Sequence, residues 1–314
     1  MTRQRAVFLA ALALASALVA APAAAAPATP EIAAGGPLVG AAYDARTGAA
    51  LGPVDVAARI AQAEIVLLGE RHDNPDHHAL QAWAVAVAAA GAPEGRLVLE
   101  MVRTGEDGPL ADATPADVPA LGDALGWEAR GWPDYGMYAP ILAAALDAGW
   151  TLAGGDAAQA EMADPGALSP AERTRLGLDA PLPEAGRAAM ETAIVEGHCG
   201  LLPLEHVSAF IDAQRLRDAR LADALLAADG PAVLIAGSGH VVPEGAPAYL
   251  AARAPTRAVL AIAFVEAPAD IADPAALVPD FGTAQAPYDI AWFTADLPRE
   301  DMCAQLRARF GDAQ

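Results

Sequence analysis

The sequence predicts an α/β protein: an open, mainly parallel sheet with flanking helices and a helical insertion that caps it. The first observation is a set of short apolar runs, which are EIVLLG (64–69), RLVLEM (96–101), WTLAGG (150–155), AVLIAG (232–237) and AVLAIAFV (258–265). Continuous Val, Ile and Leu without polar alternation are typical of strands buried on both faces of a parallel sheet. The second observation is that helical patterns separate these runs, and this alternation favours a parallel α/β sheet.

The other elements follow from local signals. Residues 38–52 are expected to form two short strands around a turn at Thr47-Gly48, because glycine tolerates the turn backbone. The segment YDIAWF (288–293) is interpreted as an antiparallel edge strand. Helices are predicted over 54–63, 75–90, 137–147, 205–228 and 244–253.

Residues 157–204 do not fit the alternation of strands and helices. Their prolines are Pro165, Pro170, Pro181, Pro183 and Pro203. Short helical patches such as 185–195 lie between these prolines, so the segment is predicted to be a helical insertion or cap. The sequence leaves open whether it is a mobile lid or a packed insert.

The first 26 residues have the order of a secretory signal peptide, with Arg3 and Arg5 before an apolar run and small residues after it. The run is shorter than the roughly 20 apolar residues that span a bilayer. Residues 27–37 are then a flexible leader, and residues 38–314 form the α/β domain. We expect export, most simply to a periplasm. No cysteine in the leader could carry a lipid anchor.

Composition excludes several classes of function. The formal net charge is −21, which opposes binding to nucleic acid or to an anionic membrane surface. All 19 basic residues are arginine, so neither a Schiff-base lysine nor a phosphate-loop lysine is available. An apolar fraction of 54% supports a sizeable core.

Acids and histidines gather at the predicted strand ends. Glu70 and His72 follow the first run, Glu100 ends the second, Asp156 follows the third and His240 follows the fourth. The carboxyl ends of parallel strands lie along one edge, so these side chains are expected to converge in a ligand-binding cleft. As alternatives, Glu100 could pair with an arginine and Asp156 could cap a helix.

Two kinds of chemistry suit this set. Glu70, His72, Glu100 and His240 could ligate a divalent metal such as zinc, manganese or iron. Without a metal, Glu70, His72 and His240 would be the catalytic residues, because a His–Glu pair can activate water as a general base.

The stretch DNPDHHALQ continues from His72 into a helix with an N-cap at Asn74 and Pro75 in its first position. His77 and His78 then lie in the first turn, outside the apolar stripe. They are interpreted either as a solvated pair or as ligand contacts at the mouth of the cleft.

Other candidates lie outside the strand ends. GWPDYGMYAP (131–140) holds Tyr135 and Tyr138, whose rings suit a packing corner or a flat ligand. His198 precedes Cys199, which could form a disulfide with Cys303 or take part in a metal or haem site. The helix that follows carries a charged cluster, which suits either a solvated face or carboxylate binding: Arg215, Arg217, Asp218 and Arg220.

The motifs VLLGERHDNPDHHALQ, LVLEM, GHCGLLP, AQRLRDARLADALL and LIAGSGHVVPEGAPAYL resemble those of the ChaN-like haem-binding uptake proteins. That family belongs to a superfamily with the Tiki, TraB and erythromycin esterase proteins. The resemblance implies an exported α/β protein for haem or iron acquisition. It implies a haem or iron complex, a haem-uptake transporter and a second copy in a homodimer as partners. Related hydrolases imply a catalytic or metal centre at Glu70, His72, Glu100 and His240. Family members are often lipoproteins, and this leader departs from them by lacking a lipobox cysteine.

Two hypotheses follow. The leading one is an exported, non-enzymatic haem- or iron-binding protein with cofactor contacts at His77, His78, Tyr135, Tyr138 and His198. The alternative is a hydrolase, metal-dependent or His/Glu-assisted, that works in the strand-end cleft.

Overall fold

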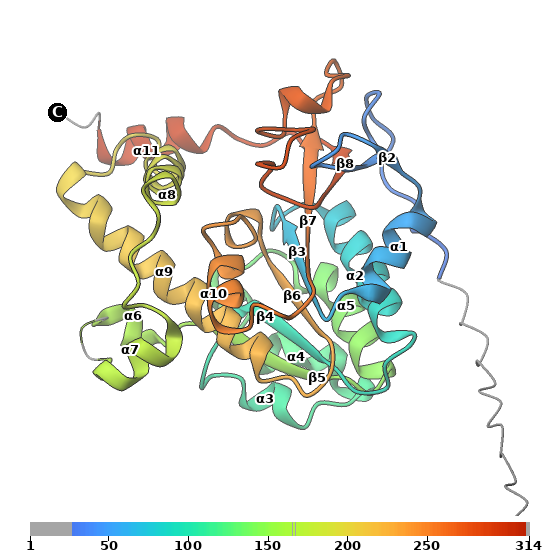
Figure 1. Cartoon of the computed structure of the whole chain (residues 1–314), viewed down its shortest axis with the longest axis horizontal. Helices are drawn as coiled ribbons and strands as arrows, with labels where there is room; N and C mark the ends of the chain where they lie inside the picture. Colours follow the sequence, from blue (N-terminus) through green and yellow to red (C-terminus); the bar gives the residue numbers. More distant parts are fainter. Residues whose placement is uncertain (1–26, 165, 167, 312–314) are drawn as a thin grey trace, which may run out of the picture.

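The computed structural model describes residues 27–164, 166 and 168–311, so the predicted signal peptide lies outside the described residues. The strands form one sheet in the order β2-β1-β8-β7-β3-β6-β4-β5 (Figure 1). All strands from β8 to β5 are parallel, which confirms the predicted architecture. Their bounds are β1 Ala42–Asp44, β2 Ala50–Leu51, β3 Ile65–Glu70, β4 Arg96–Arg103, β5 Thr151–Asp156, β6 Ala232–Gly237, β7 Val259–Ala267 and β8 Ile290–Ala295.

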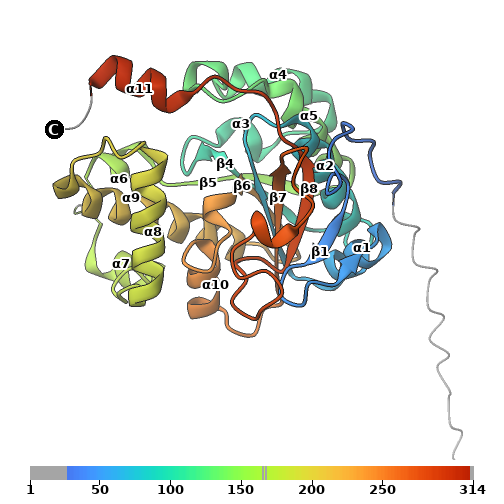
Figure 2. The ribbon, with the colours of Figure 1, turned by 90° about the horizontal axis from the view of Figure 1, so that it is seen from above.

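Helices cover both faces of this sheet. Helices α1, α2, α4 and α5 pack on one face, while α9 and α10 pack on the other (Figures 1 and 2). The bounds are α1 Pro53–Gln62, α2 Pro75–Ala89, α3 Gly108–Ala111, α4 Val118–Ala124, α5 Tyr135–Asp147, α6 Gln159–Ala163, α7 Pro170–Leu176, α8 Glu184–Gly197, α9 Leu204–Leu226, α10 Ala246–Arg253 and α11 Met302–Phe310.

The two helical layers explain why the central strands are apolar throughout. In β3, Val66 and Leu68 join the core beneath α2 and α5, whereas Ile65 and Leu67 join the core beneath α9 and α10. Successive side chains of a strand point to opposite faces, and here both faces are covered. The alternation also aims Glu70 at the α2 side of the sheet.

The interpretation of residues 288–293 as an antiparallel edge strand was wrong. Strand β8 pairs in parallel with β7 and antiparallel with β1, so it lies inside the sheet. The β1–β2 hairpin covers its outer side, and the hairpin turns at Gly48 as predicted, with a φ of +72°. A short, strongly buried strand does not reveal from its sequence which neighbours pair with it.

The predicted insertion contains α6, α7 and α8 and leads into the long helix α9. Helices α8 and α9 share a small core of their own around Met190, Val207 and Ile211. A disulfide between Cys199 and Cys303 attaches α11 to the turn between these helices. Figure 2 shows the segment after β8 crossing to this side of the molecule to reach α11.

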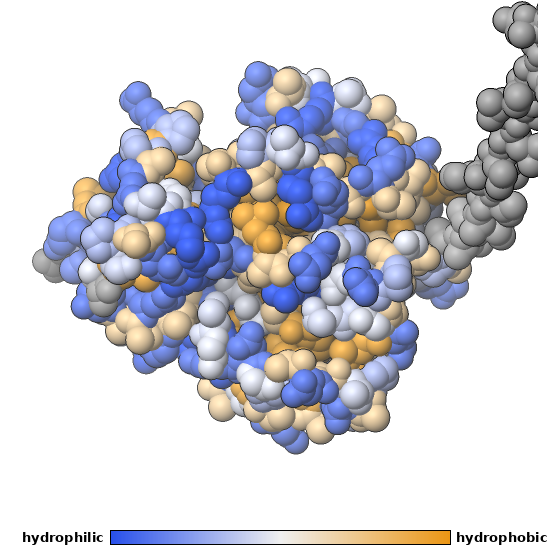
Figure 3. Space-filling view, turned by 60° about the horizontal axis from the view of Figure 1, so that its bottom comes forward, coloured by the Kyte–Doolittle hydropathy of each residue, from blue (hydrophilic) through white to orange (hydrophobic). Residues whose placement is uncertain are grey.

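The surface of the described residues is mainly polar on the face that Figure 3 shows. Polar residues cover most of this face, with separate apolar patches between them. Within the described ranges, no helix combines the length and the apolar character needed to cross a membrane.

The part of the predicted leader that is described contacts α2, where Trp83 Nε1 donates to the Pro27 carbonyl over 2.9 Å.

Candidate functional site

Acidic and imidazole side chains from four strand ends lie together at the carboxyl edge of the sheet. Glu70 ends β3, Glu100 lies in β4 and Asp156 ends β5. His72 follows β3, and His240 lies in a short helical turn that follows β6. Parallel strands deliver their carboxyl ends to one edge, so residues far apart in the sequence become neighbours.

On the α2 and α5 side of the sheet, buried Glu70 is the centre of a hydrogen-bonded group. Tyr138 donates its hydroxyl proton to Glu70 Oε1 over 2.7 Å, and His72 Nδ1 lies 2.7 Å from the same oxygen. His78 Nδ1 lies 3.2 Å from Glu70 Oε2, an ion-pair contact without hydrogen-bond geometry. The nitrogens of His78 also face two acceptors, Gln81 Oε1 and the His72 carbonyl, so a doubly protonated ring satisfies both.

On the α9 side, Glu100 is the centre of a second group. Arg217 Nη2 donates to Glu100 Oε1 and Arg217 Nε donates to Asp156 Oδ1, both over 2.7 Å. His240 lies between two carboxylates, with Nε2 at 3.2 Å from Glu100 Oε1 and Nδ1 at 2.6 Å from Asp218 Oδ1. One guanidinium and one imidazole therefore connect acids from two strands and a helix.

His72 connects the two groups at the edge of the sheet. Its Nδ1 contacts Glu70, and its Nε2 lies 3.8 Å from Glu100 Oε2. The His72 side chain is 33% exposed, and its ring packs edge-on against Trp132. Gly237 makes this approach sterically feasible, because a Cβ atom there would lie 3.0 Å from His72 Nε2. The Gly237 amide also donates to Glu100 Oε2 over 2.7 Å.

The carboxylates hold protons on the neighbouring imidazoles. Burial by itself lowers the pKa of His240, but its two flanking carboxylates raise that pKa to about 10. Burial also lowers the pKa of His72, and the hydrogen bond to Glu70 and the charge of Glu100 give a net increase. Burial raises the pKa of Glu70, but the hydrogen bond from His72 and the ion-pair contact with His78 lower it to about 2.

His77 and His78 are core residues, which contradicts the expectation that they lie outside the buried stripe. Both are almost fully buried, because the first turn of α2 packs against the ends of β3 and β8. The Arg71 amide donates to His77 Nδ1 over 2.8 Å, and His77 Nε2 lies 2.8 Å from Thr294 Oγ1. Burial lowers the pKa of His77 to about 3, so its ring is neutral. Its two hydrogen bonds hold the start of α2 against Arg71 and Thr294.

The geometry does not support the predicted zinc, manganese or iron centre. The four predicted ligands do lie together, namely Glu70, His72, Glu100 and His240. Their nitrogens and oxygens already bind one another, and Arg217 forms an ion pair with Glu100. Among the described residues, no group of three or more His, Cys, Asp or Glu side chains is arranged to hold a metal ion. The internal guanidinium is the physical reason, because it supplies the positive charge that the acids require.

The two predicted tyrosine contacts have different surroundings. Trp132, whose ring contacts His72, lines a pocket of about 720 Å³ together with Tyr135. The Tyr135 hydroxyl donates to the Val118 carbonyl over 2.7 Å, and burial raises the pKa of this phenol to about 12. Tyr138 is fully buried and belongs to the Glu70 group.

His198 is not part of the strand-end group. It caps the C-terminus of α8, where its Nδ1 lies 2.7 Å from the Ile194 carbonyl oxygen and its ring packs against Phe210. The neighbouring Cys199 forms a disulfide with Cys303, which decides between the roles that the sequence left open for these cysteines.

Sequence reasoning missed the inward roles of Arg217 and Asp218. Both were assigned to a charged cluster, for which a solvated helix face with intrahelical ion pairs was favoured over carboxylate binding. Asp218 is fully buried, and burial raises its pKa to about 6. A signal was present: the buried positions Val207, Ile211, Asp218 and Leu225 follow helical spacing, and an acid on such a stripe needs a buried partner.

Comparison with known proteins places the chain in a family. Residues 56–250 match the family model described as haem-binding uptake, Tiki superfamily, ChaN. The chain belongs to this family. ChaN of Campylobacter jejuni, whose structure is described as showing cofacial haem binding, matches this ChaN-family chain with a TM-score of 0.60 and 18% identity. The match covers 80% of this chain and 95% of that one, and it supports the fold.

A second solved structure is more distant. The type III effector HopBA1 matches with a TM-score of 0.41 and 17% identity, over 78% of this chain and 94% of that one. Among curated proteins, none matches the chain.

Proposed function

We propose that this ChaN-family protein is an exported haem-binding protein that takes part in haem or iron uptake. The observation that carries the proposal is the family match over residues 56–250, because this region contains every side chain of the strand-end network. The cofacial haem described for the Campylobacter protein supports haem as the cargo.

The charges of the strand-end network fit a binding protein that needs no metal of its own. Four carboxylates face four cations when the imidazoles are protonated, and the network consists of Glu70, Glu100, Asp156, Asp218, Arg217, His72, His78 and His240. Such pairing neutralises buried acids that would otherwise repel the propionates of a haem. The network therefore fixes the strand ends, and haem would bind outside it.

A hemin titration tests the proposal. Hemin added to the mature protein should give a saturable, shifted Soret band with a defined stoichiometry. Serum albumin at the same concentration controls for non-specific adsorption, and free hemin controls for aggregation. The proposal fails if the spectrum equals that of free hemin under both oxidising and reducing conditions.

The geometry of His72 favours a second candidate, a His/Glu-assisted hydrolase. Its Nδ1 contacts Glu70 at 2.7 Å and its ring is one-third exposed at the strand-end edge, as a general base would be. A screen of ester and peptide substrates tests this candidate with His72→Ala. His206→Ala is a matched control, because His206 is an exposed histidine on α9. If the wild-type protein hydrolyses a substrate and His72→Ala hydrolyses it at the same rate, the candidate is wrong.

A further inference from the structure

Four of the five side chains predicted to contact haem already have hydrogen-bond partners within the protein. His77 is buried and neutral, with both ring nitrogens bonded. His78 directs both nitrogens at acceptors within the core. The phenol proton of Tyr138 is donated to Glu70, and that of Tyr135 is donated to a backbone carbonyl. A ligand to iron needs an accessible lone pair, which none of these four groups offers.

His198 has the opposite arrangement. Its Nδ1 lies 2.7 Å from the Ile194 carbonyl oxygen, so Nδ1 carries the proton and donates it. The lone pair is then on Nε2, and no partner for Nε2 is found in the part of the chain that the structure describes. The ring is partly exposed. Histidines that bind metals commonly have their second nitrogen fixed in this way by a carbonyl group.

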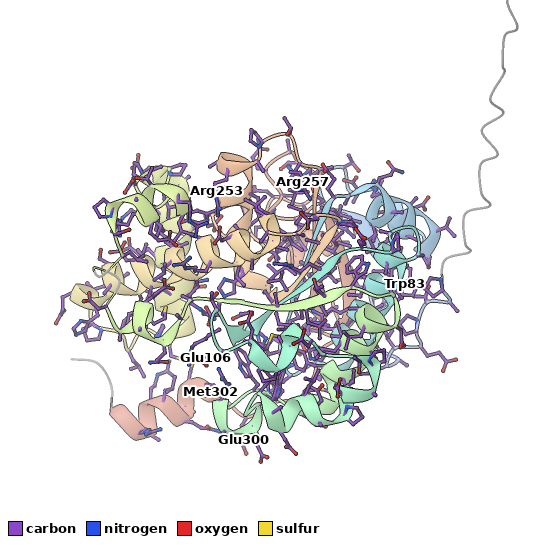
Figure 4. All side chains as sticks on the ribbon, turned by 90° about the horizontal axis from the view of Figure 1, so that it is seen from below. Trp83, Glu106, Arg253, Arg257, Glu300 and Met302 are labelled. Atoms are coloured by element: carbon purple, nitrogen blue, oxygen red, sulfur yellow. A yellow bond between two sulfur atoms is a disulfide. The ribbon has the colours of Figure 1, made fainter. Side chains whose placement is uncertain are left out.

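The surroundings of His198 suit the apolar face of a porphyrin. The Phe210 ring lies edge-on to the imidazole with its centroid 4.8 Å away, and Phe210 is 40% exposed. The disulfide of Cys199 brings α11 to this turn, and Met302, at the start of α11 in Figure 4, is 62% exposed. Helix α9 and the helix that the disulfide attaches to the turn before it thus each carry a large exposed apolar side chain, of the kind that can form a binding surface.

Helix α11 also supplies a cation of the kind that propionates bind. Arg307 lies one turn beyond Cys303, on the same side of the helix. It is exposed and makes no ion pair within the described ranges. An arginine here could bind a propionate with two parallel hydrogen bonds. Because the chain has a net charge of −21, an exposed arginine without an ion pair gives the anionic propionate a local cation to bind.

We infer that His198 ligates the iron of haem through Nε2, on a surface made by the α8–α9 turn and α11, with Phe210 and Met302 against the porphyrin and Arg307 on a propionate. The inference rests on the proposed haem binding and names its ligand. The disulfide has a function in this arrangement, because it holds the two halves of the surface together.

Hemin titration of the wild-type protein, His198→Ala and His206→Ala tests the inference. His206 is an exposed histidine on the same helical hairpin, so it controls for the loss of any surface imidazole. We expect His198→Ala to lose the nitrogen-ligated iron signature in absorption and electron paramagnetic resonance spectra, and His206→Ala to keep it. Added imidazole should restore the signature in His198→Ala, compared with hemin and imidazole without protein.

A second variant addresses affinity without touching the ligand. Arg307→Ala should keep the wild-type spectrum and bind hemin about tenfold more weakly. Circular dichroism checks that each variant is folded. If wild-type protein binds hemin and His198→Ala gives the same spectrum and affinity, the inference is wrong while the proposed function stands. If wild-type protein does not bind hemin, both fail.

Discussion

Arg217 donates a hydrogen bond to Glu100 over 2.7 Å and so joins helix α9 to strand β4 at the edge where the functional side chains gather. The same guanidinium binds Asp156 at the end of β5. An internal cation therefore organises acids from neighbouring strands. The strand-end centre of this ChaN-family protein is built as an ion-pair network with His72 at its exposed side.

Removing this cation should destabilise the fold. Arg217→Ala leaves two buried carboxylates without their partner, which we expect to cost about 3 kcal/mol in the free energy of unfolding. The difference should appear in the midpoint of urea denaturation at an unchanged slope. Arg187→Ala is a matched control, because Arg187 is exposed on α8 and makes no ion pair within the described residues. If both variants unfold at the wild-type midpoint, the role given to Arg217 is wrong.

The free energy of unfolding should fall as the solution becomes alkaline, because His240 then loses its proton. Its pKa is raised from 6.5 to about 10 in the folded protein, so the folded state binds more protons than the unfolded state between these values. The free energy of unfolding should therefore fall as the pH rises from about 6.5 to about 10. Denaturation of the wild type, His240→Gln and His206→Gln across this range measures the effect. Equal pH slopes for wild type and His240→Gln would contradict the prediction.

The two tyrosines of helix α5 should differ in their contribution to stability. Tyr138 donates to the charged Glu70, so Tyr138→Phe should cost about 1.5–3 kcal/mol. Tyr135 donates to the neutral carbonyl of Val118, so Tyr135→Phe should cost only about 1 kcal/mol. Thermal and urea unfolding of both variants gives the order, and a larger loss in Tyr135→Phe would overturn the assignment of Glu70 as a buried centre.

The disulfide should hold α11 in place. Met302 is 62% exposed, and none of the residues 302–309 is fully buried, so helix packing alone anchors this part of α11 weakly. In a Cys199→Ser/Cys303→Ser variant, trypsin should cleave faster within residues 296–309, because local opening exposes this segment. Mass spectrometry after reduction follows the cleavage in both proteins. Equal rates would show that the disulfide does not anchor this helix.

The sequence predicted the sheet because its central strands carry an unambiguous signal. Within EIVLLG, residues 65–68 are apolar at every position, and only burial on both faces explains that pattern. The convergence of Glu70, Glu100 and His240 followed from topology alone, since parallel strands end at one edge. The helix that begins after Asn74 was predicted from its cap, and the structure confirms that Asn74 accepts from the Asp76 amide.

Side-chain contacts that depend on tertiary packing could not be predicted from the sequence. His77 and His78 look like surface residues in a helical pattern. His77 is nevertheless bonded to Thr294, which is 217 residues away, and His78 contacts Glu70 at the end of the preceding strand. Asp218 could not be assigned to His240 without knowing that α9 crosses the end of β6. Which side chains pair over long sequence distances depends on the packed fold, so a single sequence does not predict these pairs.

Transfer of haem tests the central claim most directly. Wild-type protein loaded with one equivalent of hemin and separated from free hemin should pass its cargo to apomyoglobin, as followed by the myoglobin Soret band. The account predicts complete and saturable loading, followed by transfer that stops when the bound hemin is exhausted. A protein that elutes without hemin, or whose loading never saturates, would contradict haem binding as its function.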